Sequence, residues 1–530
     1  MRTSREAANL LRGRIAIAAL ISAVGFSVVA ARLVDVMVLS STVRRESPVT
    51  PAIKRADIVD RNGALIARDL PVTDLYATPA VFWDPAGAAH QLAAVTSAGE
   101  ERLTAAFAPK KGYILVQRSL TPEQRDAVMQ LGLPGLEFVA GHKRFYPSGR
   151  TVAHAVGQVD TDDNGISGLE LGLQNRLRSD DDPVRLSLDI RVQYVVEHEA
   201  AEAMQSFHAR AAGGIVMNVH TGEIWALASL PDYEPNLRKL QPGDSVRNRM
   251  TQDVYELGSI FKIFAFTEAV EEKTVSLDEP INVVSPYRLG HYLIHDFERL
   301  GPALPAAMVF ADSSNIGTAQ IELRSGPDKQ KPFLRKLGLL SPLKTELPEM
   351  ASPLYPRHWE TVEAATIAYG HGISVNPLTF AAAAAAVVNG GTLIHPTFLR
   401  HREAQQGERV ISEETSRTMR QLLRLVVTNG TGTKADVPGY DVGGKTGTAE
   451  KAENGSYAHH LLISSFCGVF PIDDPQFLVF LMLDEPHGNR ESGGFATGGE
   501  TAAPAVGRII ARIAPLLGVA QRDTYVAANP

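Results

Sequence analysis

The chain has 530 residues, enough for about three domains, and its 44% hydrophobic and 21% charged residues are typical of globular proteins. Its net charge of −7, without a long basic run, argues against a nucleic acid as partner. The single cysteine, Cys467, excludes a disulfide within the chain and a cysteine metal cluster, and its apolar neighbours predict a buried thiol.

An apolar segment near the N-terminus predicts a membrane anchor. Residues 15–31 carry no charge and follow several arginines, and at about 1.5 Å per residue a helix of this length nearly spans a bilayer. Just beyond it come only Arg32 and Asp35, which lie near one end and can reach the interface. We therefore expect a cytoplasmic tail over 1–14 and a single transmembrane anchor over 15–39.

A cleaved signal peptide is the alternative to an anchor. Val29 and Ala31 would suit a small-residue cleavage site, although the apolar segment is longer than that of a usual signal peptide. Charge does not settle the orientation, because the basic residues after the segment roughly balance the arginines before it. These later basic residues are Arg44, Arg45, Lys54 and Arg55.

Residues 40–185 are predicted to form short strands and turns in a separate, non-catalytic module. An Asn-Gly pair at 62–63 is typical of a tight turn and predicts a hairpin between 58–59 and 64–66. Since no cluster in this module has the spacing of a nucleophile with its base or of metal ligands, we interpret the clusters as residues that fix an irregular backbone. Three of them are rich in charged residues and glycine, at 55–63, 144–149 and 165–170.

Residues 186–530 are predicted to form one domain of the α/β (α+β) class. The expected elements are a helix at 191–207, strands at 214–219 and 223–228, a helical insertion over 255–430 with a tightly packed alanine-rich helix at 380–388, strands at 442–448, 463–470 and 477–483, and a helix at 503–517. This order favours a five-stranded antiparallel sheet covered by the terminal helices, with a helical lobe beside it and a cleft between the two.

The sequence from Gly258 to Lys262 opens a strongly apolar helix and indicates a serine nucleophile. Residues three apart on a helix share a face, which would place the Lys262 amine beside the Ser259 hydroxyl. A lysine desolvated among apolar side chains has a lowered pKa and can act as the base that a serine needs. Gly258 is expected to leave room for a ligand at the helix start, where free N–H groups favour an oxyanion.

Two further motifs supply the other groups that such a site needs. In Ser313-Ser314-Asn315, the first hydroxyl could relay a proton, and the amide could hold a substrate amide or orient Lys262. The second motif is Lys445-Thr446-Gly447-Thr448. Its lysine and hydroxyls suit the binding of a carboxylate and the transfer of a proton, and its glycine is expected to let substrate approach the strand edge.

Two other segments share these spacings but fit poorly. Ser341 has Lys344 at the right distance, but Pro342 and Pro348 bracket it too closely for a buried helix behind the serine. The Ser-x-Asn of 374–376 falls at the mouth of the alanine-rich helix, without a nucleophile helix nearby. We therefore place the site at Ser259.

In this order, the Ser-x-x-Lys, Ser-x-Asn and Lys-Thr-Gly motifs are the signature of the penicillin-recognising acyl-serine enzymes. The three clusters of the first module and the sequences at 247–249, 369–378 and 443–449 resemble class B penicillin-binding proteins, and the resemblance covers nearly the whole chain. Within that class the chain most resembles the septal, FtsI-type members, and the elongation type is the alternative. Leu257, where proline is common, and Ala56, where glycine is usual, depart from the class pattern.

The resemblance implies a D,D-transpeptidase that cross-links peptidoglycan outside the inner membrane, with no metal or other cofactor. Ser259 would attack the penultimate D-alanine carbonyl of a stem peptide, Lys262 would be the acylation base, and the Ser259 and Thr448 N–H groups would hold the oxyanion. The implied catalytic residues are Ser259, Lys262, Ser313, Asn315 and Lys445, and the implied substrate-binding residues are Thr446, Gly447 and Thr448.

The implied partners are stem peptides ending in D-Ala-D-Ala, β-lactams, a SEDS-family membrane glycosyltransferase and other division proteins, with the catalytic domain in the periplasm at the septum. Two other functions remain as alternatives. A β-lactamase would hydrolyse the same acyl bond, but the class A deacylation motif is not found in 352–366. A β-lactam sensor would need a signalling region that the short N-terminal tail does not provide.

Overall fold

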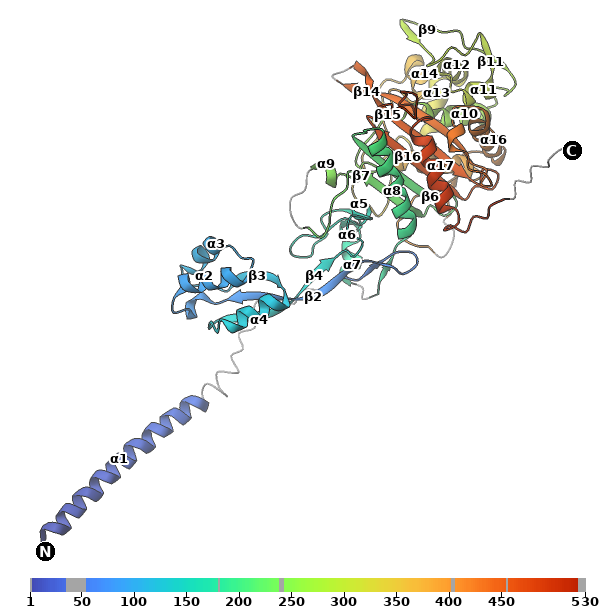
Figure 1. Ribbon diagram of the computed structural model, residues 1–530. Helices are drawn as coiled ribbons and strands as arrows, with labels where there is room; N and C mark the ends of the chain where they lie inside the picture. The colour runs from blue at the N-terminus through green and yellow to red at the C-terminus, as the bar shows by residue number, and fades with distance from the viewer. Residues whose placement is uncertain are drawn as a thin grey trace. The chain divides into compact units, whose positions relative to one another are not determined.

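The computed structural model describes residues 2–34, 54–179, 182–237, 243–401, 406–453 and 456–522. The chain divides into two compact units, Met1–Ile53 with Thr73–Gly141, and Lys54–Val72 with His142–Pro530 (Figure 1). The predicted domain boundary between residues 185 and 186 falls inside the second unit and stays a prediction. The predicted end of the anchor at residue 39, like Arg44 and Arg45, lies outside the described residues.

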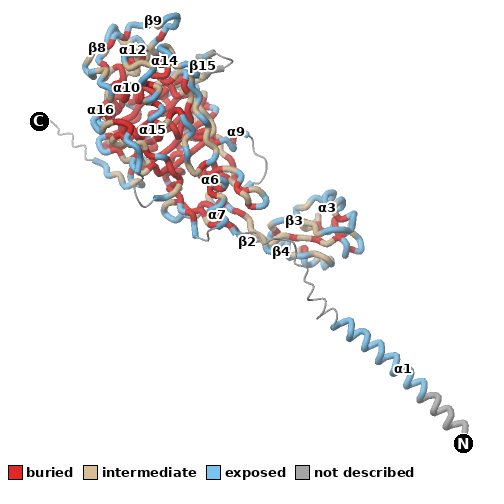
Figure 2. The backbone as a smooth tube through the Cα atoms, turned by 180° about the vertical axis from the view of Figure 1, so that it is seen from behind, coloured by how far each residue is buried: buried red, intermediate tan, exposed pale blue. Residues whose placement is uncertain are grey.

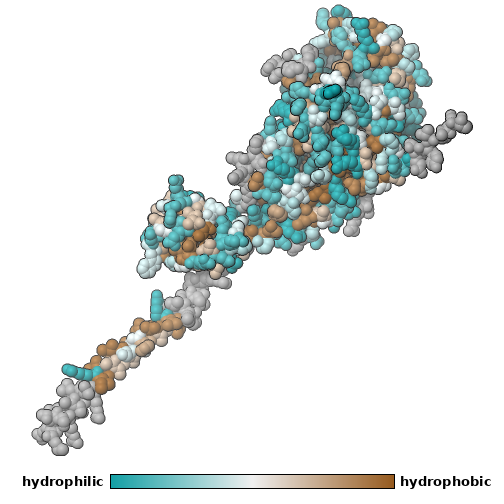
Figure 3. All heavy atoms as spheres, viewed as in Figure 1, coloured by the Kyte–Doolittle hydropathy of each residue, from teal (hydrophilic) through white to brown (hydrophobic). Residues whose placement is uncertain are grey.

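Helix α1, Arg2–Val34, is the one helix of the described residues that is long and apolar enough to cross a membrane. Its apolar part, Gly13–Val34, buries none of its surface inside the protein, and Figure 3 shows hydrophobic side chains along it. The helix therefore contains the apolar segment that the sequence predicts, as far as Val34.

The first unit contains three helices that the sequence did not predict. They are α2 (Pro85–Val95), α3 (Glu100–Phe107) and α4 (Pro122–Gln130), with a 3₁₀ turn η3 (Pro79–Val81) before them. They share a core with β3 (Ile114–Leu120) and the end of β2 (Leu65–Ala77), to which β4 (Leu136–Phe145) also pairs. Short helices with few buried side chains, such as Leu103 and Phe107 in α3, carry too weak an apolar period to be recognised.

The second unit begins with a hairpin that confirms the predicted Asn-Gly turn. Strand β1 (Ile58–Val59) pairs antiparallel with β2, and Gly63 in the turn has a φ of +94°. On its other side β1 pairs parallel with β5 (Val184–Arg185). The short helices α5 (Ala153–Val156), α6 (Gly168–Gly172) and α7 (Gln174–Ser179) lie between β4 and β5 in the chain.

The three charged clusters of the first module meet in one buried ion-pair network. Glu170 accepts from Arg55 Nη2 at 2.7 Å and from Arg144 Nε at 2.6 Å, and Arg144 also pairs with Asp69 at 3.0 Å. All four side chains are buried. Two guanidinium groups without water need these carboxylates, so the network fixes the irregular backbone here by charge rather than by regular structure.

The core of the second unit is the predicted five-stranded antiparallel sheet, in the order β14-β15-β16-β6-β7. Its strands are β6 (Ala211–Asn218), β7 (Ile224–Leu230), β14 (Gly443–Glu453), β15 (Ser456–Phe470) and β16 (Phe477–Asp484). The predicted terminal helices, α8 (Ile190–Ser206) and α17 (Ala502–Ile513), pack against each other and cover one face (Figure 1). Cys467 lies buried in β15, and burial raises the pKa of its thiol to about 12.

The helical lobe packs on the other face, where most of the buried residues gather (Figure 2). Its helices are α10 (Lys262–Glu271), α11 (Ala306–Ala311), α12 (Asn315–Ser325), α13 (Pro327–Lys336), α14 (Thr361–Ala368), α15 (Pro377–Val388) and α16 (Glu413–Asn429), with a 3₁₀ turn η5 (Thr433–Ala435). Every residue of α15 is buried, which confirms the alanine-rich segment as a tightly packed helix.

Small strand pairs and one short helix complete the second unit. β8 (Pro280–Asn282) pairs with β11 (Ala303–Pro305), β9 (Tyr287–Leu289) with β10 (Tyr292–Ile294), and β12 (Thr392–Leu393) with β13 (Glu408–Arg409). The short helix α9 (Gly243–Val246) precedes the nucleophile segment.

The buried network predicts a large penalty for removing its shared carboxylate. Glu170→Ala leaves two guanidinium groups buried with one carboxylate between them, and we expect the free energy of unfolding to fall by about 3–5 kcal/mol. Chemical denaturation followed by circular dichroism measures this change. The matched control is Arg68→Ala, which removes an exposed pair with Asp57 and should leave the unfolding midpoint almost unchanged. Equal midpoints for both variants would contradict the role given to the network.

Candidate active site

Ser259 lies on a 3₁₀ turn, η4 (Gly258–Phe261), and Lys262 is the first residue of α10 directly after it. The sequence predicted an α-helix here, and the tighter turn improves the alignment, because residues three apart eclipse one another in a 3₁₀ helix. Lys262 Nζ lies 3.1 Å from Ser259 Oγ. The predicted apolar surroundings are present, since Lys262 is fully buried with Phe261 and Phe264 beside it.

Gly258 has a different role from the predicted one. Its φ is +60°, and a Cβ there would collide with the carbonyl oxygen of Thr448. A Cβ on Gly370 would in turn collide with the carbonyl of Gly258. The missing side chains therefore let three backbone segments meet, rather than leaving room for a ligand.

The Ser313–Asn315 segment surrounds the Lys262 amine. Lys262 Nζ lies 3.0 Å from Ser313 Oγ, 2.5 Å from Ser313 O and 2.7 Å from Asn315 Oδ1. Ser313 has a left-handed φ of +62°, which turns its hydroxyl and its carbonyl towards the same amine. Of the two predicted uses of the Asn315 amide, its oxygen matches the second, orientation of Lys262.

The buried amine of Lys445 contacts the same Ser313 hydroxyl as Lys262 does. Lys445 Nζ lies 2.9 Å from Ser313 Oγ, so this oxygen is within hydrogen-bond reach of two lysines. Burial lowers the pKa of Lys445 to about 7, partly offset by Asp312. Burial first, and the charge of Lys445 second, lower the pKa of Lys262 well below its ordinary value. The Ser313 hydroxyl therefore bridges two amines whose pKa values are both lowered, and that of Lys445 lies near neutral pH.

The rest of the Lys-Thr-Gly-Thr motif lies on β14, which packs against η4. Thr446 Oγ1 lies 2.6 Å from Thr431 Oγ1, and Thr448 Oγ1 accepts from Gly498 N at 3.1 Å. A Cβ on Gly447 would collide with Ser465 and approach the Leu257 carbonyl. Gly447 thus lets the strand pack closely on the turn, and its expected part in substrate approach stays a prediction.

Asp296 is a site residue that the sequence did not reveal. Its carboxylate accepts from Asn315 N at 2.5 Å, Ser314 Oγ at 2.7 Å and Ile316 N at 3.0 Å, and so caps the start of α12. Asn315 Nδ2 also donates to His295 O at 3.1 Å. The N-cap of α12 is Ser314, which accepts from Gly317 N at 2.9 Å; the additional acceptor, Asp296, comes from a separate loop and has no local sequence signal.

Glu256 is a second residue that the sequence did not reveal. It accepts from Gly372 N and from the Tyr457 hydroxyl, each at 3.0 Å. His371 stacks edge-on against Tyr457, and burial lowers the pKa of His371 to about 4, so the imidazole is neutral at pH 7. Glu256 thus links the segment that leads to Ser259 with the loop at 370–372 and with β15.

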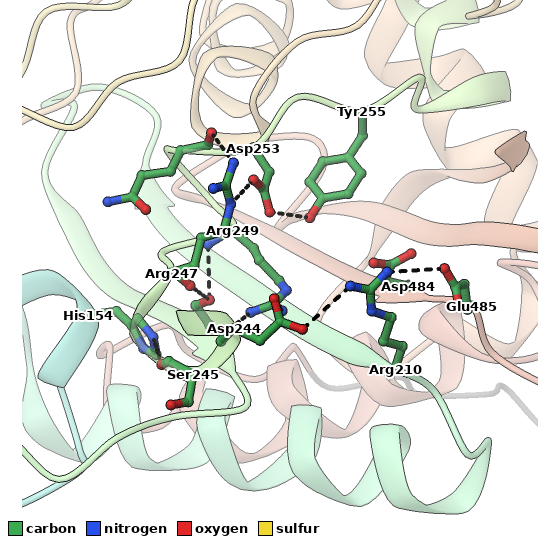
Figure 4. A network of polar contacts seen from close by, with 12 residues as sticks. His154, Arg210, Asp244, Ser245, Arg247, Arg249, Asp253, Tyr255, Asp484 and Glu485 are labelled. Atoms are coloured by element: carbon green, nitrogen blue, oxygen red, sulfur yellow. Dashed lines mark hydrogen bonds and ion pairs between the residues drawn. The ribbon is translucent and has the colours of Figure 1, made fainter. Parts of the chain in front are cut away.

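A polar network holds the segment that leads to Ser259 (Figure 4). Arg249 Nη1 donates to Asp244 O at 2.8 Å, Arg247 pairs with Asp253, and the Tyr255 hydroxyl donates to Asp253 at 3.1 Å. The backbone of Tyr255 then bonds in both directions to Val375. Through these contacts the Arg-Asn-Arg sequence at 247–249 helps to hold the segment that leads to Ser259.

The two weaker candidates do not join the site. Ser341 and Lys344 are exposed on a loop after α13, with no helix behind the serine. Asn376 caps α15 by accepting from Thr379 N at 2.8 Å. Among the described residues, no group of three or more His, Cys, Asp or Glu could hold a metal ion.

Known proteins resemble both parts of the chain. Two family models match the chain, the Penicillin-binding Protein dimerisation domain over residues 50–204 and the Penicillin binding protein transpeptidase domain over residues 212–511. The probable peptidoglycan D,D-transpeptidase FtsI of Caulobacter vibrioides is 40% identical over 490 residues, which cover 89% of this chain and 83% of the relative. The peptidoglycan D,D-transpeptidase FtsI of Escherichia coli is 28% identical, covering 90% and 86%.

A solved structure extends the similarity to the fold. Penicillin binding protein 3 from Mycobacterium tuberculosis, in complex with ampicillin, aligns with a TM-score of 0.71 at 25% identity, over 90% of this chain and 98% of that one.

The Asp296 cap predicts a defect in any reaction that uses Lys262. Asp296→Ala leaves the Ser314 cap of α12 in place but removes the acceptor of Asn315 N and Ile316 N, which loosens Asn315, so we expect covalent labelling of Ser259 by a penicillin to slow by about 10-fold or more. Stopped-flow fluorescence gives the rate, and thermal unfolding gives the stability cost, about 1 kcal/mol for a lost cap. Asp84→Ala is the matched control, because it removes the cap of α2 in the other unit. An unchanged labelling rate for Asp296→Ala would refute the assignment.

Proposed function

Because the chain belongs to the class B penicillin-binding proteins, we propose that Ser259 is the nucleophile of its transpeptidase reaction. The chain is a peptidoglycan D,D-transpeptidase of the FtsI type, a serine acyl transferase that binds β-lactams. The observation that carries the assignment of Ser259 is the buried Lys262 amine, 3.1 Å from Ser259 Oγ and in contact with Ser313 and Asn315.

In the proposed acylation, neutral Lys262 takes the proton of Ser259 as the hydroxyl attacks the penultimate D-alanine carbonyl. The Ser259 and Thr448 N–H groups would hold the resulting oxyanion. As the amide C–N bond breaks, the leaving D-alanine amine takes a proton that Ser313 can pass from Lys262, since the serine hydroxyl is within reach of both lysines. The acyl group then passes to the amine of a neighbouring stem.

The terminal carboxylate of the substrate would bind at the Lys-Thr-Gly-Thr strand. Two hydroxyls and one amine are available there: Thr446 Oγ1 lies 3.4 Å from Lys445 Nζ, and Thr448 follows two residues on. Below pH 7, Lys445 is mainly charged, which favours a carboxylate, whereas Lys262 must be neutral to act as the base. In this proposal Lys445 supplies the positive charge and Lys262 accepts the proton.

The lack of a deacylating carboxylate favours transfer over hydrolysis. Among the described residues, no carboxylate hydrogen-bonds to Ser259 or Lys262; Asp296 is taken up by α12 and Glu256 by Gly372 and Tyr457. A water molecule at the acyl bond would therefore lack a base of the kind that β-lactamases use. We expect a long-lived penicillin adduct.

Labelling of site variants tests this mechanism. Ser259→Ala should abolish the adduct, and Lys262→Ala should slow its formation by at least ~10²-fold, the usual effect of losing a positioned base. Asn315→Ala and Thr446→Ala should slow it less, because they lose hydrogen bonds rather than the attacking group. Mass spectrometry of the protein with excess penicillin should show one stable adduct on the peptide that carries Ser259.

Ser341→Ala is the control, because it removes the exposed serine of the other Ser-x-x-Lys sequence and should label normally. An adduct on Ser341, or rapid multiple turnover of penicillin, would overturn the assignment of Ser259 or of transfer.

The same proposal gives a place in the cell and partners. We assign 1–14 to the cytoplasm, 15–39 to an uncleaved anchor and the remainder to the periplasm at the division septum, where peptidoglycan is cross-linked. Residues 40–185 would form the non-catalytic pedestal, and a SEDS-family glycosyltransferase with other division proteins would be its partners. The apolar helix α1 and the similarity to FtsI proteins support this placement.

A topology fusion tests the orientation. Alkaline phosphatase folds into an active enzyme only outside the cytoplasm, so a fusion after Pro530 should be active, and a fusion within residues 1–14 should be inactive. N-terminal sequencing of the membrane-bound protein completes the experiment. A mature chain that begins near Arg32 would show a cleaved signal peptide and refute the anchor.

A further inference from the structure

Two carboxyl groups lie buried behind the site, with three of their four oxygens unpartnered in the described structure. Glu268 on α10 and Glu322 on α12 are each only 1% exposed. Both oxygens of Glu268 and Oε1 of Glu322 have no hydrogen-bond partner in the described structure. Buried polar groups are nearly always paired, so an orphaned pair of this kind calls for an explanation.

The two side chains line the same narrow cavity. It lies among α10, α12, α13 and α14 and leaves no room for a water molecule. The aromatic rings of Phe261 and Phe264, which flank Lys262 in the chain, form part of its wall. An ionised carboxylate here would have neither water nor a counter-ion, whereas a neutral carboxylic acid fits such surroundings.

The charged and polar groups around the cavity do not change this conclusion. On α10, Glu272 adds negative charge, and on α13 its ion-pair partner Lys329 adds positive charge, both at the exposed rim. Gln330 on α13 donates to Ala364 O on α14 and accepts from Trp359, and a hydrogen bond from its side chain favours the charged form of Glu322, against the larger effect of burial. Burial raises the pKa of Glu268 to about 8 and that of Glu322 well above its ordinary value.

The position of the pair relates it to the site. Lys262 is the first residue of α10 and Asn315 the first of α12, and the two are joined by the 2.7 Å contact between Nζ and Oδ1. Glu268 and Glu322 lie six and seven residues further along, about 9–10 Å down each helix. The same two packed helices therefore carry the contact between Lys262 and Asn315 at their first residues and the carboxyl pair about two turns further along.

We propose that Glu268 and Glu322 are positioning residues for acylation, held as neutral acids so that α10 and α12 stay packed and Lys262 stays aligned with Asn315. Ionisation of the pair places unpaired negative charge in the cavity and separates the helices, which loosens the Lys262 contact. The inference rests on the proposed acylation of Ser259.

The pair makes stability depend on pH in a defined direction. The folded pKa of Glu268, about 8, is above its ordinary value of 4.5, so its contribution to stability is complete below pH 4.5 and is lost as the pH rises through 8. Glutamine has the shape of the neutral acid and does not ionise. The double variant Glu268→Gln with Glu322→Gln should therefore match the wild type at pH 4 and melt at a higher temperature at pH 9.

The decisive measurement is the penicillin acylation rate of variant and wild type from pH 6 to pH 9.5. Titration of Lys262 and Lys445 affects both proteins, so the ratio of their rates isolates the carboxyl pair. We expect the ratio of the variant rate to the wild-type rate to rise by about 3–10-fold between pH 7 and pH 9.5. One unit of pKa shift corresponds to a tenfold change in an equilibrium constant, which sets the upper end of this range. The two single glutamine variants should each show part of the rise.

Glu413→Gln is the matched control, because it makes the same substitution at an exposed position of α16, and its ratio should stay flat. A flat ratio for the double variant would overturn the positioning role, even if its melting temperature diverged from that of the wild type. Coinciding melting curves at every pH would overturn the neutral state of the pair. A wild-type protein without an adduct at any pH would overturn the proposed function, and this inference with it.

Discussion

The structure of the site depends on one buried amine. Lys262 Nζ is out of contact with water, and its hydrogen bonds go to Ser259, Ser313 and Asn315. Burial of an unpaired ammonium is expensive, so the protein stabilises the neutral amine, which is the form that can accept a proton from serine. The surrounding elements act mainly to hold four oxygens from three residues around this nitrogen: a 3₁₀ turn for Ser259, a left-handed backbone at Ser313, which supplies two of them, and a capped helix start at Asn315.

Most of the fold was predictable because its signals are local. Alternation and turn residues revealed the strands of the sheet, and the apolar period revealed α8 and α17 at its ends. The order of elements then left few topologies, and the antiparallel sheet follows from them. The helices of the first unit escaped prediction because they bury few side chains each, and the pairing of Arg55 with Glu170 is a tertiary contact between residues far apart in the chain.

The site was predictable as a set of residues but not as an arrangement. Three short motifs predicted the site residues, and the structure brings the groups of Ser259, Lys262, Ser313, Asn315 and Lys445 into contact. The substrate-binding role of Thr446, Gly447 and Thr448 stays a prediction. Sequence could not show that Gly258 and Gly447 serve backbone packing, because their neighbours come from other elements. Asp296 and the pair Glu268 and Glu322 were missed for related reasons: a distant cap has no local pattern, and glutamates on a helix are usually exposed.

The costly features of this domain cluster around α10 and α12. Two buried lysines, a serine with a left-handed backbone and two buried carboxyl groups with unpaired oxygens are each costly to fold, and they lie on α10, α12, the turn before α12 and β14. The ion-pair network around Glu170 is different, since its charges are paired and no chemistry is near it. If burial of charge served only folding, the lysines would have carboxylate partners as Arg55 and Arg144 do. Their partners are instead uncharged hydroxyls, an amide and backbone carbonyls, which leave a lysine able to lose its proton, and this is what nucleophilic catalysis by serine requires.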